Sequence, residues 1–334
     1  MAVGDAVAVA ARNVDPMSAI SPQVPIRPSD RPSRGDRIFR GFTVGAAMLA
    51  LVTVVVAILF LANEARPALS STGLKNFFTS TIWNGFIGQF GILGVMVGTM
   101  IIATIAMIVA VPAALSMALF INEYAPRKVG RLLTSVVDLL AALPSLIFGM
   151  WGRDAFQQKL VPVARWLSDH LYAIPFFRLS AEDVVLVRSS FVVGVIVGIM
   201  VIPIITSISR DVMAQAPRDV CEAALGLGGT RWGMIRTVIL PFGRSGIIGG
   251  ILLAFGRALG ETIAVALIIQ LTFDINWHVL EAGGSSVAGL IAVRFGEATP
   301  LERSGLIAAG FALLVLTFTV NLIARRIVKR GQIK

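Results

Sequence analysis

Residues 210–244 read RDVMAQAPRDVCEAALGLGGTRWGMIRTVILPFGR, a largely polar stretch between two apolar ones. Pro217 suits the first turn of a helix, because the backbone N–H that proline lacks would have no partner there. Residues 218–225 propagate the helix, and Gly226 and Gly228 supply positions that tolerate the left-handed backbone at which helices end. The first part of the stretch therefore predicts a short helix that stops at a glycine elbow.

A second short helix is predicted on the far side of this elbow. The Thr230 hydroxyl can cap its N-terminus. Pro241 would terminate it after Val238, since proline cannot donate the hydrogen bond that continues a helix. Apolar stretches at 189–209 and 245–271 flank the pair. We therefore expect residues 210–244 to form two short helices held outside a membrane, between two spans.

The composition of the whole chain agrees with a membrane environment. Apolar residues make up 56% of the 334 residues and charged residues 14%, against about 45–50% and about 25% in soluble domains. Stretches long enough to cross about 30 Å of hydrocarbon occur six times, at 41–63, 92–121, 132–152, 189–209, 245–271 and 304–326. We expect an all-α integral membrane protein with six transmembrane helices.

The distribution of Lys and Arg predicts the orientation of these helices. The segments 1–40, 122–131, 210–244 and 327–334, with Arg325 and Arg326, hold 19 basic and 8 acidic residues. The alternate segments 64–91, 153–188 and 272–303 hold 9 basic and 9 acidic residues. Cytoplasmic loops carry the excess of Lys and Arg, so both termini are predicted inside. The same asymmetry explains the net charge of +10 as topology, and it argues against a nucleic-acid partner.

Two long segments, 1–40 and 153–188, lie outside the predicted spans. Residues 1–40 are rich in Ala, Pro and Arg and lack the apolar core of a signal peptide, so we expect a largely disordered cytoplasmic tail before the domain at 41–330. The external segment 153–188 predicts a short amphipathic helix, which either lies on the membrane surface or caps the bundle. Its apolar positions are Phe156, Leu160, Val163, Leu167 and Leu171.

The fifth apolar stretch, 245–271, carries two charges. At 1.5 Å per residue from its start, Arg257 lies about 18 Å and Glu261 about 24 Å into the membrane. A charge at that depth costs about 2.5–3.5 kcal/mol on insertion scales, so it must face protein, a partner charge or water. The spacing of four residues predicts that both side chains share one helix face and can pair.

Two interpretations of this pair stay open. It is either a structural ion pair or part of an anion site, because arginine presents a planar fork of donors that matches tetrahedral oxyanions. On the same helix Gly256 and Gly260 form a G-x-x-x-G step, which predicts close packing of a further helix. A charged stripe beside a close-packing stripe is typical of a helix that lines a pathway at a subunit interface.

Other kinds of chemistry find little support. Cys221 is the only cysteine, and His170 and His278 are the only histidines, so we expect no disulfide framework, metal centre or cofactor. None of the five lysines follows a glycine, which excludes the phosphate-binding loop G-x-x-x-x-G-K-[ST] of an ATPase. We therefore predict that the chain is not itself an enzyme.

The 210–244 stretch resembles the EAA loop of the permeases of ABC importers, written EAA-x3-G-x9-I-x-LP. In this family the loop forms a coupling helix that docks into a groove on the ATPase subunit. Val238 stands where the family usually has isoleucine. The matching residues are Glu222, Ala223, Ala224, Gly228, Leu240 and Pro241.

Three further segments resemble the phosphate-specific (Pst) permeases and, by the ending Trp151-Gly152, their PstC type. These segments are FFTSTIWN at 77–84, followed by Gln89-Phe90-Gly91, AALPSLIFGMWG at 141–152 and GRALGETIAV at 256–265. The resemblance covers roughly residues 75–330.

The resemblance implies a fold, a location and a set of partners. It implies a type I ABC importer permease in the bacterial plasma membrane that moves phosphate past Arg257 and Glu261. The partners would be a PstA-like second permease, two ABC ATPase subunits and an extracytoplasmic phosphate-binding protein. An importer of another oxyanion, such as phosphonate or sulfate, and a stand-alone secondary transporter or channel remain alternatives.

Overall fold

The computed structural model describes residues 34–330. Most of the predicted tail, residues 1–33, lies outside the described residues, and a helix begins within the rest of it. The chain divides into two units at Val56. Helix α1 (Arg34–Glu64) runs across this division and has no buried residue. It covers the first predicted span, 41–63.

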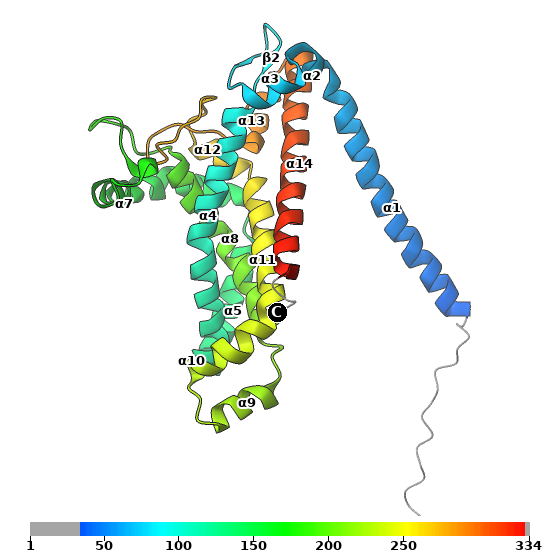
Figure 1. The fold of residues 1–334 in the computed structure, drawn as a ribbon, viewed down its shortest axis with the longest axis vertical. Helices are drawn as coiled ribbons and strands as arrows, with labels where there is room; N and C mark the ends of the chain where they lie inside the picture. Colours follow the sequence, from blue (N-terminus) through cyan, green and yellow to red (C-terminus); the bar gives the residue numbers. More distant parts are fainter. Residues whose placement is uncertain (1–33, 331–334) are drawn as a thin grey trace, which may run out of the picture. The chain divides into compact units, whose positions relative to one another are not determined.

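The core of the second unit is built on two long helices, α4 (Leu93–Leu119) and α8 (Ser190–Met213). They pack closely because α8 places glycines at the contact. A Cβ atom at Gly194 would lie 2.7 Å from Ile105, and one at Gly198 would lie 2.9 Å from the Ala106 carbonyl oxygen. Helices α11 (Leu240–Leu259) and α14 (Pro300–Arg330) complete the upright bundle in Figure 1.

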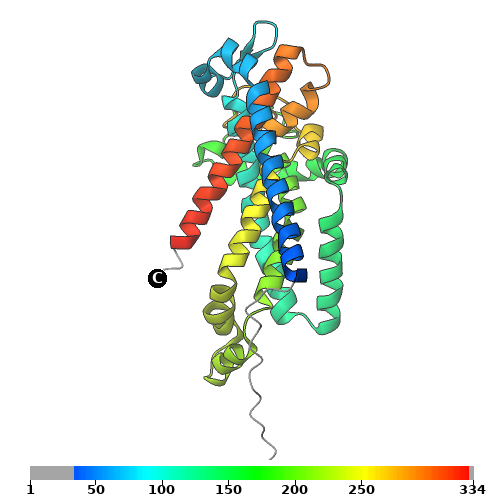
Figure 2. The ribbon, with the colours of Figure 1, turned by 90° about the vertical axis from the view of Figure 1, so that its right-hand side faces the viewer.

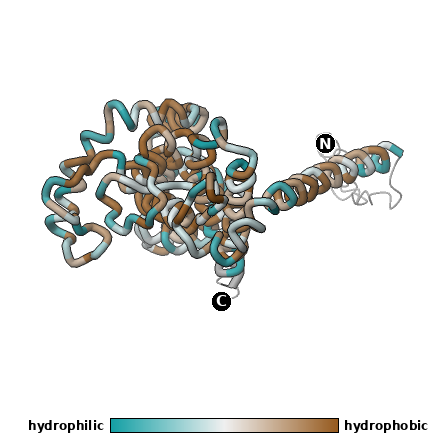
Figure 3. The backbone as a smooth tube through the Cα atoms, turned by 90° about the horizontal axis from the view of Figure 1, so that it is seen from above, coloured by the Kyte–Doolittle hydropathy of each residue, from teal (hydrophilic) through white to brown (hydrophobic). Residues whose placement is uncertain are grey.

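Five helices in the described range are long and apolar enough to cross a membrane, and a sixth span exists if one bent helix pair is counted. In the bundle seen from above, hydrophobic residues fill the helices and hydrophilic ones lie mostly in peripheral loops (Figure 3). Large apolar side chains such as Ile108, Leu253 and Phe318 are more than 60% exposed on the chain's surface. Surfaces of this kind are stable in lipid or against another subunit.

The third predicted span, 132–152, is wrong as a single helix. Helix α5 (Arg127–Ala142) ends before Pro144, and α6 (Ser145–Trp151) starts a new direction, so the chain bends by 91°. The physical reason is local. Proline disfavours the helical conformation in the residue before it, and Leu143 is accordingly extended, with φ −66° and ψ 134°.

The predicted amphipathic helix in 153–188 is confirmed as a helix. A π-helical turn (Gly152–Phe156) leads into α7 (Gln157–His170), which lies across the direction of α4 and α8 (Figures 1 and 2). Leu160 of the predicted apolar face is buried, whereas Val163 is 44% exposed. A short 3-10 helix, Pro175–Phe177, follows.

Short elements close the end of the bundle where α14 begins. A second core cluster there joins buried side chains such as Phe77, Phe90 and Leu306. The elements concerned are α2 (Arg66–Thr72), α3 (Leu74–Thr79), the antiparallel strands β1 (Trp83–Asn84) and β2 (Gln89–Phe90), and α13 (Val287–Arg294).

Candidate coupling loop and translocation site

The polar loop at 210–244 has the two-helix form that its sequence predicts. Helix α9 (Arg218–Gly226) carries Glu222, Ala223 and Ala224, and none of its residues is buried. Pro217 precedes its first turn as the cap residue. Only its inner side contacts the bundle, where Cys221 and Ala224 pack against a buried cluster that includes Met234. The rest of α9 is exposed at one end of the chain (Figure 1).

The elbow between the two helices is confirmed. Gly228 has φ +85°, a left-handed conformation that side chains with a Cβ rarely adopt. The Thr230 hydroxyl then accepts a hydrogen bond of 3.1 Å from the Gly233 N–H and caps α10 (Arg231–Met234). Leu227, next to the elbow, is 90% exposed.

The predicted stop at Pro241 is wrong. A π-helical turn (Ile235–Ile239) follows α10, and Leu240 and Pro241 lie in the first turn of α11. Wider i→i+5 bonding in a π turn leaves room for a residue that cannot donate the usual hydrogen bond. The consequence is a continuous helical rod from Arg231 to Leu259.

The surroundings of Cys221 raise the pKa of its thiol. Burial of the thiol against the bundle is the main cause, and the negative charges of Glu123 and Glu222 add to it. The thiol is therefore held in its protonated, unreactive form to a higher pH than usual.

The fifth predicted span, 245–271, is not one helix. Helix α11 ends at Leu259, Gly260 caps it, and a separate short helix, α12 (Ile263–Ile268), begins after Thr262. The break removes the i, i+4 geometry on which the predicted Arg257–Glu261 contact depends. No ion pair or hydrogen bond joins the two residues.

The two charged residues instead have opposite environments. Glu261 is 7% exposed, and its Oε1 accepts a hydrogen bond of 3.2 Å from the Ala264 N–H at the start of α12. Arg257 is exposed on α11, and its side chain has no hydrogen bond or ion pair within residues 34–330. Glu261 thus supports the break in the helix, and Arg257 presents its charge outward.

The predicted close-packing glycines make no close contact within the described part of the chain. A Cβ at Gly256 would approach nothing nearer than the Asn321 amide at 3.9 Å, and Gly260 ends the helix. Close packing of α11 occurs at other glycines. A Cβ at Gly246 would lie 2.5 Å from Val212 of α8, and one at Gly250 would lie 3.0 Å from Ile208.

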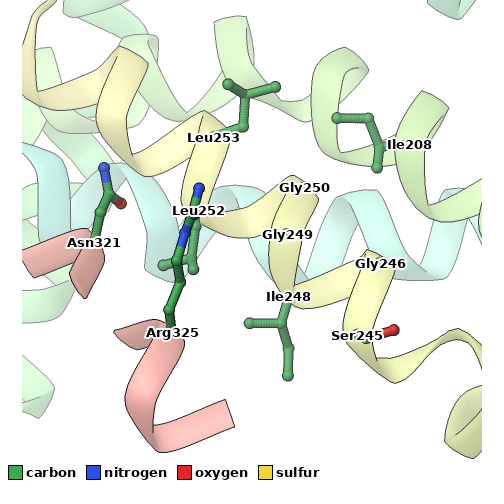
Figure 4. Close-up of a pocket in the computed structure, with 10 residues that line it drawn as sticks. All are labelled: Ile208, Ser245, Gly246, Ile248, Gly249, Gly250, Leu252, Leu253, Asn321 and Arg325. Atoms are coloured by element: carbon green, nitrogen blue, oxygen red, sulfur yellow. The ribbon is translucent and has the colours of Figure 1, made fainter. Parts of the chain in front are cut away.

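A cavity of about 660 Å³ runs along α11 on the side of the break that carries the loop. It includes Ser245, Leu253 and, from α14, Asn321 and Arg325 (Figure 4). In the sequence, Arg325 counts only as a charge at the end of a span, and Asn321 is not among the predicted site residues. The spacing of four residues between them in a mostly apolar span places both side chains on one helix face.

Within residues 34–330, no group of three or more His, Cys, Asp or Glu side chains is placed to hold a metal ion.

The described chain offers an exposed two-helix loop, a helical rod that leads from it, and an unpaired arginine beside a helix break. Together with the helical bundle, these features define the membrane-embedded permease subunit of a transporter.

Comparison with known sequences gives the family. A family model described as "Binding-protein-dependent transport system inner membrane component" matches residues 110–332. The chain is 39% identical over 302 residues to the phosphate transport system permease protein PstC 2 of Mycobacterium tuberculosis, across 89% of this chain and 93% of that protein. It is 38% identical over 305 residues to PstC of Xylella fastidiosa, across 90% and 92%. The chain belongs to this family of inner membrane components and, within it, to the PstC-type permeases.

Solved structures agree on the fold. The chain superposes on a bacterial alginate ABC transporter, solved in complex with an alginate-pentasaccharide-bound periplasmic protein, with a TM-score of 0.56 and 15% identity over 89% of this chain and 97% of that chain. A second structure of an alginate importer gives a TM-score of 0.55 and 17% identity over 88% and 99%. The predicted fold, an all-α type I ABC importer permease, is confirmed.

Proposed function

We propose that the chain is the transmembrane permease subunit of an ATP-driven ABC importer for inorganic phosphate, and that it forms half of the translocation pathway. Its PstC relatives, 33–39% identical, are named as phosphate transport permeases. The observation that carries the proposal is Arg257, an exposed and unpaired cation inside a membrane-crossing helix. Such a charge is stable in a membrane only if water, a partner subunit or an anion meets it.

The chemistry of Arg257 suits phosphate. Its guanidinium is always charged and offers a planar set of N–H donors to two oxygens at once. Because Glu261 is turned away into the α11–α12 break, no carboxylate of this pair competes with the anion for the guanidinium. A mobile anion passing the site would replace water around Arg257 and would leave again without breaking a protein ion pair.

Coupling to ATP would use the exposed helix α9. Glu222, Ala223, Ala224 and the Gly228 elbow would dock on an ATPase subunit, with Leu240 and Pro241 at the base of the rod. This rod runs about 39 Å from Arg231 to Arg257 at 1.5 Å per residue. Closure of two ATPase subunits would pull on α9 and tilt the rod, which alternately exposes Arg257 to the two sides of the membrane.

The complex would contain a PstA-like second permease, two ABC ATPase subunits and an extracytoplasmic phosphate-binding protein, in the bacterial plasma membrane. Both termini and α9 would be cytoplasmic, because the segments on that side carry the excess of Lys and Arg. Gly256 and Gly260, which have no close neighbour among residues 34–330, would face the second permease subunit.

The test is uptake of radiolabelled phosphate by the assembled complex in proteoliposomes, with the binding protein on one side and ATP on the other. We expect uptake that requires ATP and that excess unlabelled phosphate abolishes. Equal competition by sulfate or a phosphonate would show that the importer accepts other oxyanions as well as phosphate. Phosphate flux through the purified chain alone, without ATP, would contradict the importer.

A further inference from the structure

We propose that Arg325 and Asn321 of α14 form a second binding site for the transported anion, one helical turn beyond Arg257 toward the α9 end of the chain. The inference rests on the proposed function and names a further stage of the same pathway. Arg325 and Asn321 line one cavity beside α11. Within residues 34–330, the side chains of Arg257 and Arg325 and the Oδ1 atom of Asn321 have no hydrogen bond or ion pair.

The proposed site lies in a cavity beside α11. Its volume is about 660 Å³, and it extends along α11 from Ser245 to Leu253, a rise of about 12 Å. Leu253 lies four residues before Arg257, so the cavity reaches to within one turn, about 6 Å, of that arginine. Gly246, Gly249 and Gly250 form part of its wall, and a Cβ at Gly249 would meet nothing within 4 Å.

Two polar side chains of α14 line this cavity. Figure 4 shows the Arg325 side chain extending from α14 toward Leu252 of α11, with Asn321 also on α14. Within residues 34–330 the Arg325 guanidinium has no hydrogen bond or ion pair. The Asn321 Oδ1 atom is buried and also lacks a partner. A buried amide oxygen without a partner is costly, and a water or a protonated phosphate oxygen entering the cavity would satisfy it.

The ligand class follows from these donors and acceptors. A guanidinium fork, an amide with both donor and acceptor atoms, and the Ser245 hydroxyl suit a partly protonated tetrahedral oxyanion, namely the hydrogen phosphates. Because the cavity ends about one helical turn from Arg257, an anion can leave Arg257 without entering an uncharged apolar stretch, since Arg325 offers the next positive charge. Successive weak sites are how a pathway binds an ion and still releases it.

The test compares Arg325→Gln with Arg326→Gln in the full complex in proteoliposomes. Arg326 is the adjacent arginine on the same helix, is also exposed and does not line the cavity. We expect R325Q to lower phosphate uptake per assembled complex at least tenfold while R326Q stays within twofold of wild type. R325K should recover part of the loss, because it keeps the charge without the fork. Equal uptake by R325Q and wild type would overturn the proposal.

Three further outcomes would assign Arg325 a different role or contradict the proposed function. Loss of assembled complex in R325Q, with normal uptake per remaining complex, would make Arg325 a subunit contact and overturn the site. An uptake defect seen only in liposomes with anionic lipid, and absent in purely zwitterionic ones, would assign Arg325 to a lipid headgroup instead. A wild-type complex that moves no phosphate would defeat the proposed function itself, independently of Arg325.

Direct binding gives a readout separate from transport. A cysteine introduced by S245C in the cavity wall should react with a methanethiosulfonate reagent, which forms a mixed disulfide with the thiolate and releases methanesulfinate. Inorganic phosphate should slow that reaction severalfold, while chloride at equal ionic strength should not. The same protection should vanish in S245C combined with R325Q and persist in S245C combined with R326Q. Protection that survives R325Q would contradict the assignment.

Discussion

Arg257 and Glu261 lie four residues apart and do not pair, because α11 ends between them at Leu259. Glu261 is buried and accepts a hydrogen bond from the Ala264 N–H, whereas Arg257 is exposed. Discontinuous helices near the middle of a membrane are a common way to build binding sites in transporters, since the broken backbone is tolerated only where protein or water surrounds it. The unpaired arginine next to the break is therefore the centre of the proposed pathway.

The Gly228 elbow should be essential for coupling. Gly228→Val forces a β-branched side chain into φ +85°, a conformation that costs at least about 1–2 kcal/mol for any residue with a Cβ. We expect normal amounts of protein in the membrane and loss of most phosphate uptake. Gly226→Ala is the matched control, because Gly226 is helical and a Cβ there meets nothing within 4 Å. Wild-type uptake in the Gly228→Val complex would remove the coupling role of the loop.

Cys221 should report both the side of the membrane and its own electrostatic surroundings. A membrane-impermeant thiol reagent should label it only after cell lysis, whereas a cysteine placed at Lys159 in α7 should be labelled in whole cells. The reverse pattern would invert the orientation.

The labelling rate of Cys221 should also depend on pH in a specific direction. Its pKa is raised by burial and by the charges of Glu123 and Glu222. The reactive thiolate is therefore scarce at neutral pH, and the rate should keep rising above the ordinary thiol pKa. Glu222→Gln removes one negative charge, lowers the pKa and should speed labelling at a fixed pH. An unchanged rate in Glu222→Gln would contradict this electrostatic account.

Gly98 should be a strong determinant of stability. A Cβ there would lie 2.2 Å from the Ser285 carbonyl oxygen, and this backbone is fixed because Ser286 caps α13 and the Thr99 hydroxyl accepts a 3.0 Å bond from the Val287 N–H. We expect Gly98→Ala to cost about 1–3 kcal/mol, measured as a lower midpoint of thermal unfolding in detergent. Gly296→Ala, where a Cβ meets nothing within 4 Å, should leave the midpoint unchanged. Equal unfolding midpoints for the two variants would show that residues 285–287 move to make room for the added methyl group, and would contradict this prediction.

Part of this architecture could be predicted from the sequence because it depends on local chemistry. The elbow at Gly228 and the cap at Thr230 follow from residue type alone. The predictions at Pro144 and Pro241 are wrong because the effect of a proline on a helix depends on the backbone around it. Pro144 bends the chain by 91° within an apolar stretch of ordinary length, whereas Pro241 is absorbed by a π turn and stops nothing. Apolar length does not distinguish these two outcomes.

The site shows the same division between local and tertiary information. The prediction that Arg257 lies deep in the membrane rests on its distance along an apolar stretch. The missing ion pair could not be predicted in this way, since the end of α11 depends on Gly260 and on the bond from Ala264 to Glu261. Asn321 and Arg325 lie more than 60 residues further along the chain than Arg257, and only the packing of α14 on α11 brings them to the cavity.

The most direct test of the central claim is phosphate uptake per assembled complex in Arg257→Gln, Glu261→Gln and the double variant. If Arg257 meets the transported anion, R257Q abolishes uptake, and adding E261Q restores nothing, because the two residues are not partners. E261Q alone should retain the fold and part of the uptake, since a neutral amide oxygen can still accept the Ala264 N–H. If the two residues instead neutralise each other in the assembled complex, removing one leaves an orphan charge worth about 3–5 kcal/mol, and removing both restores assembly and uptake. Full recovery in the double variant would contradict the account.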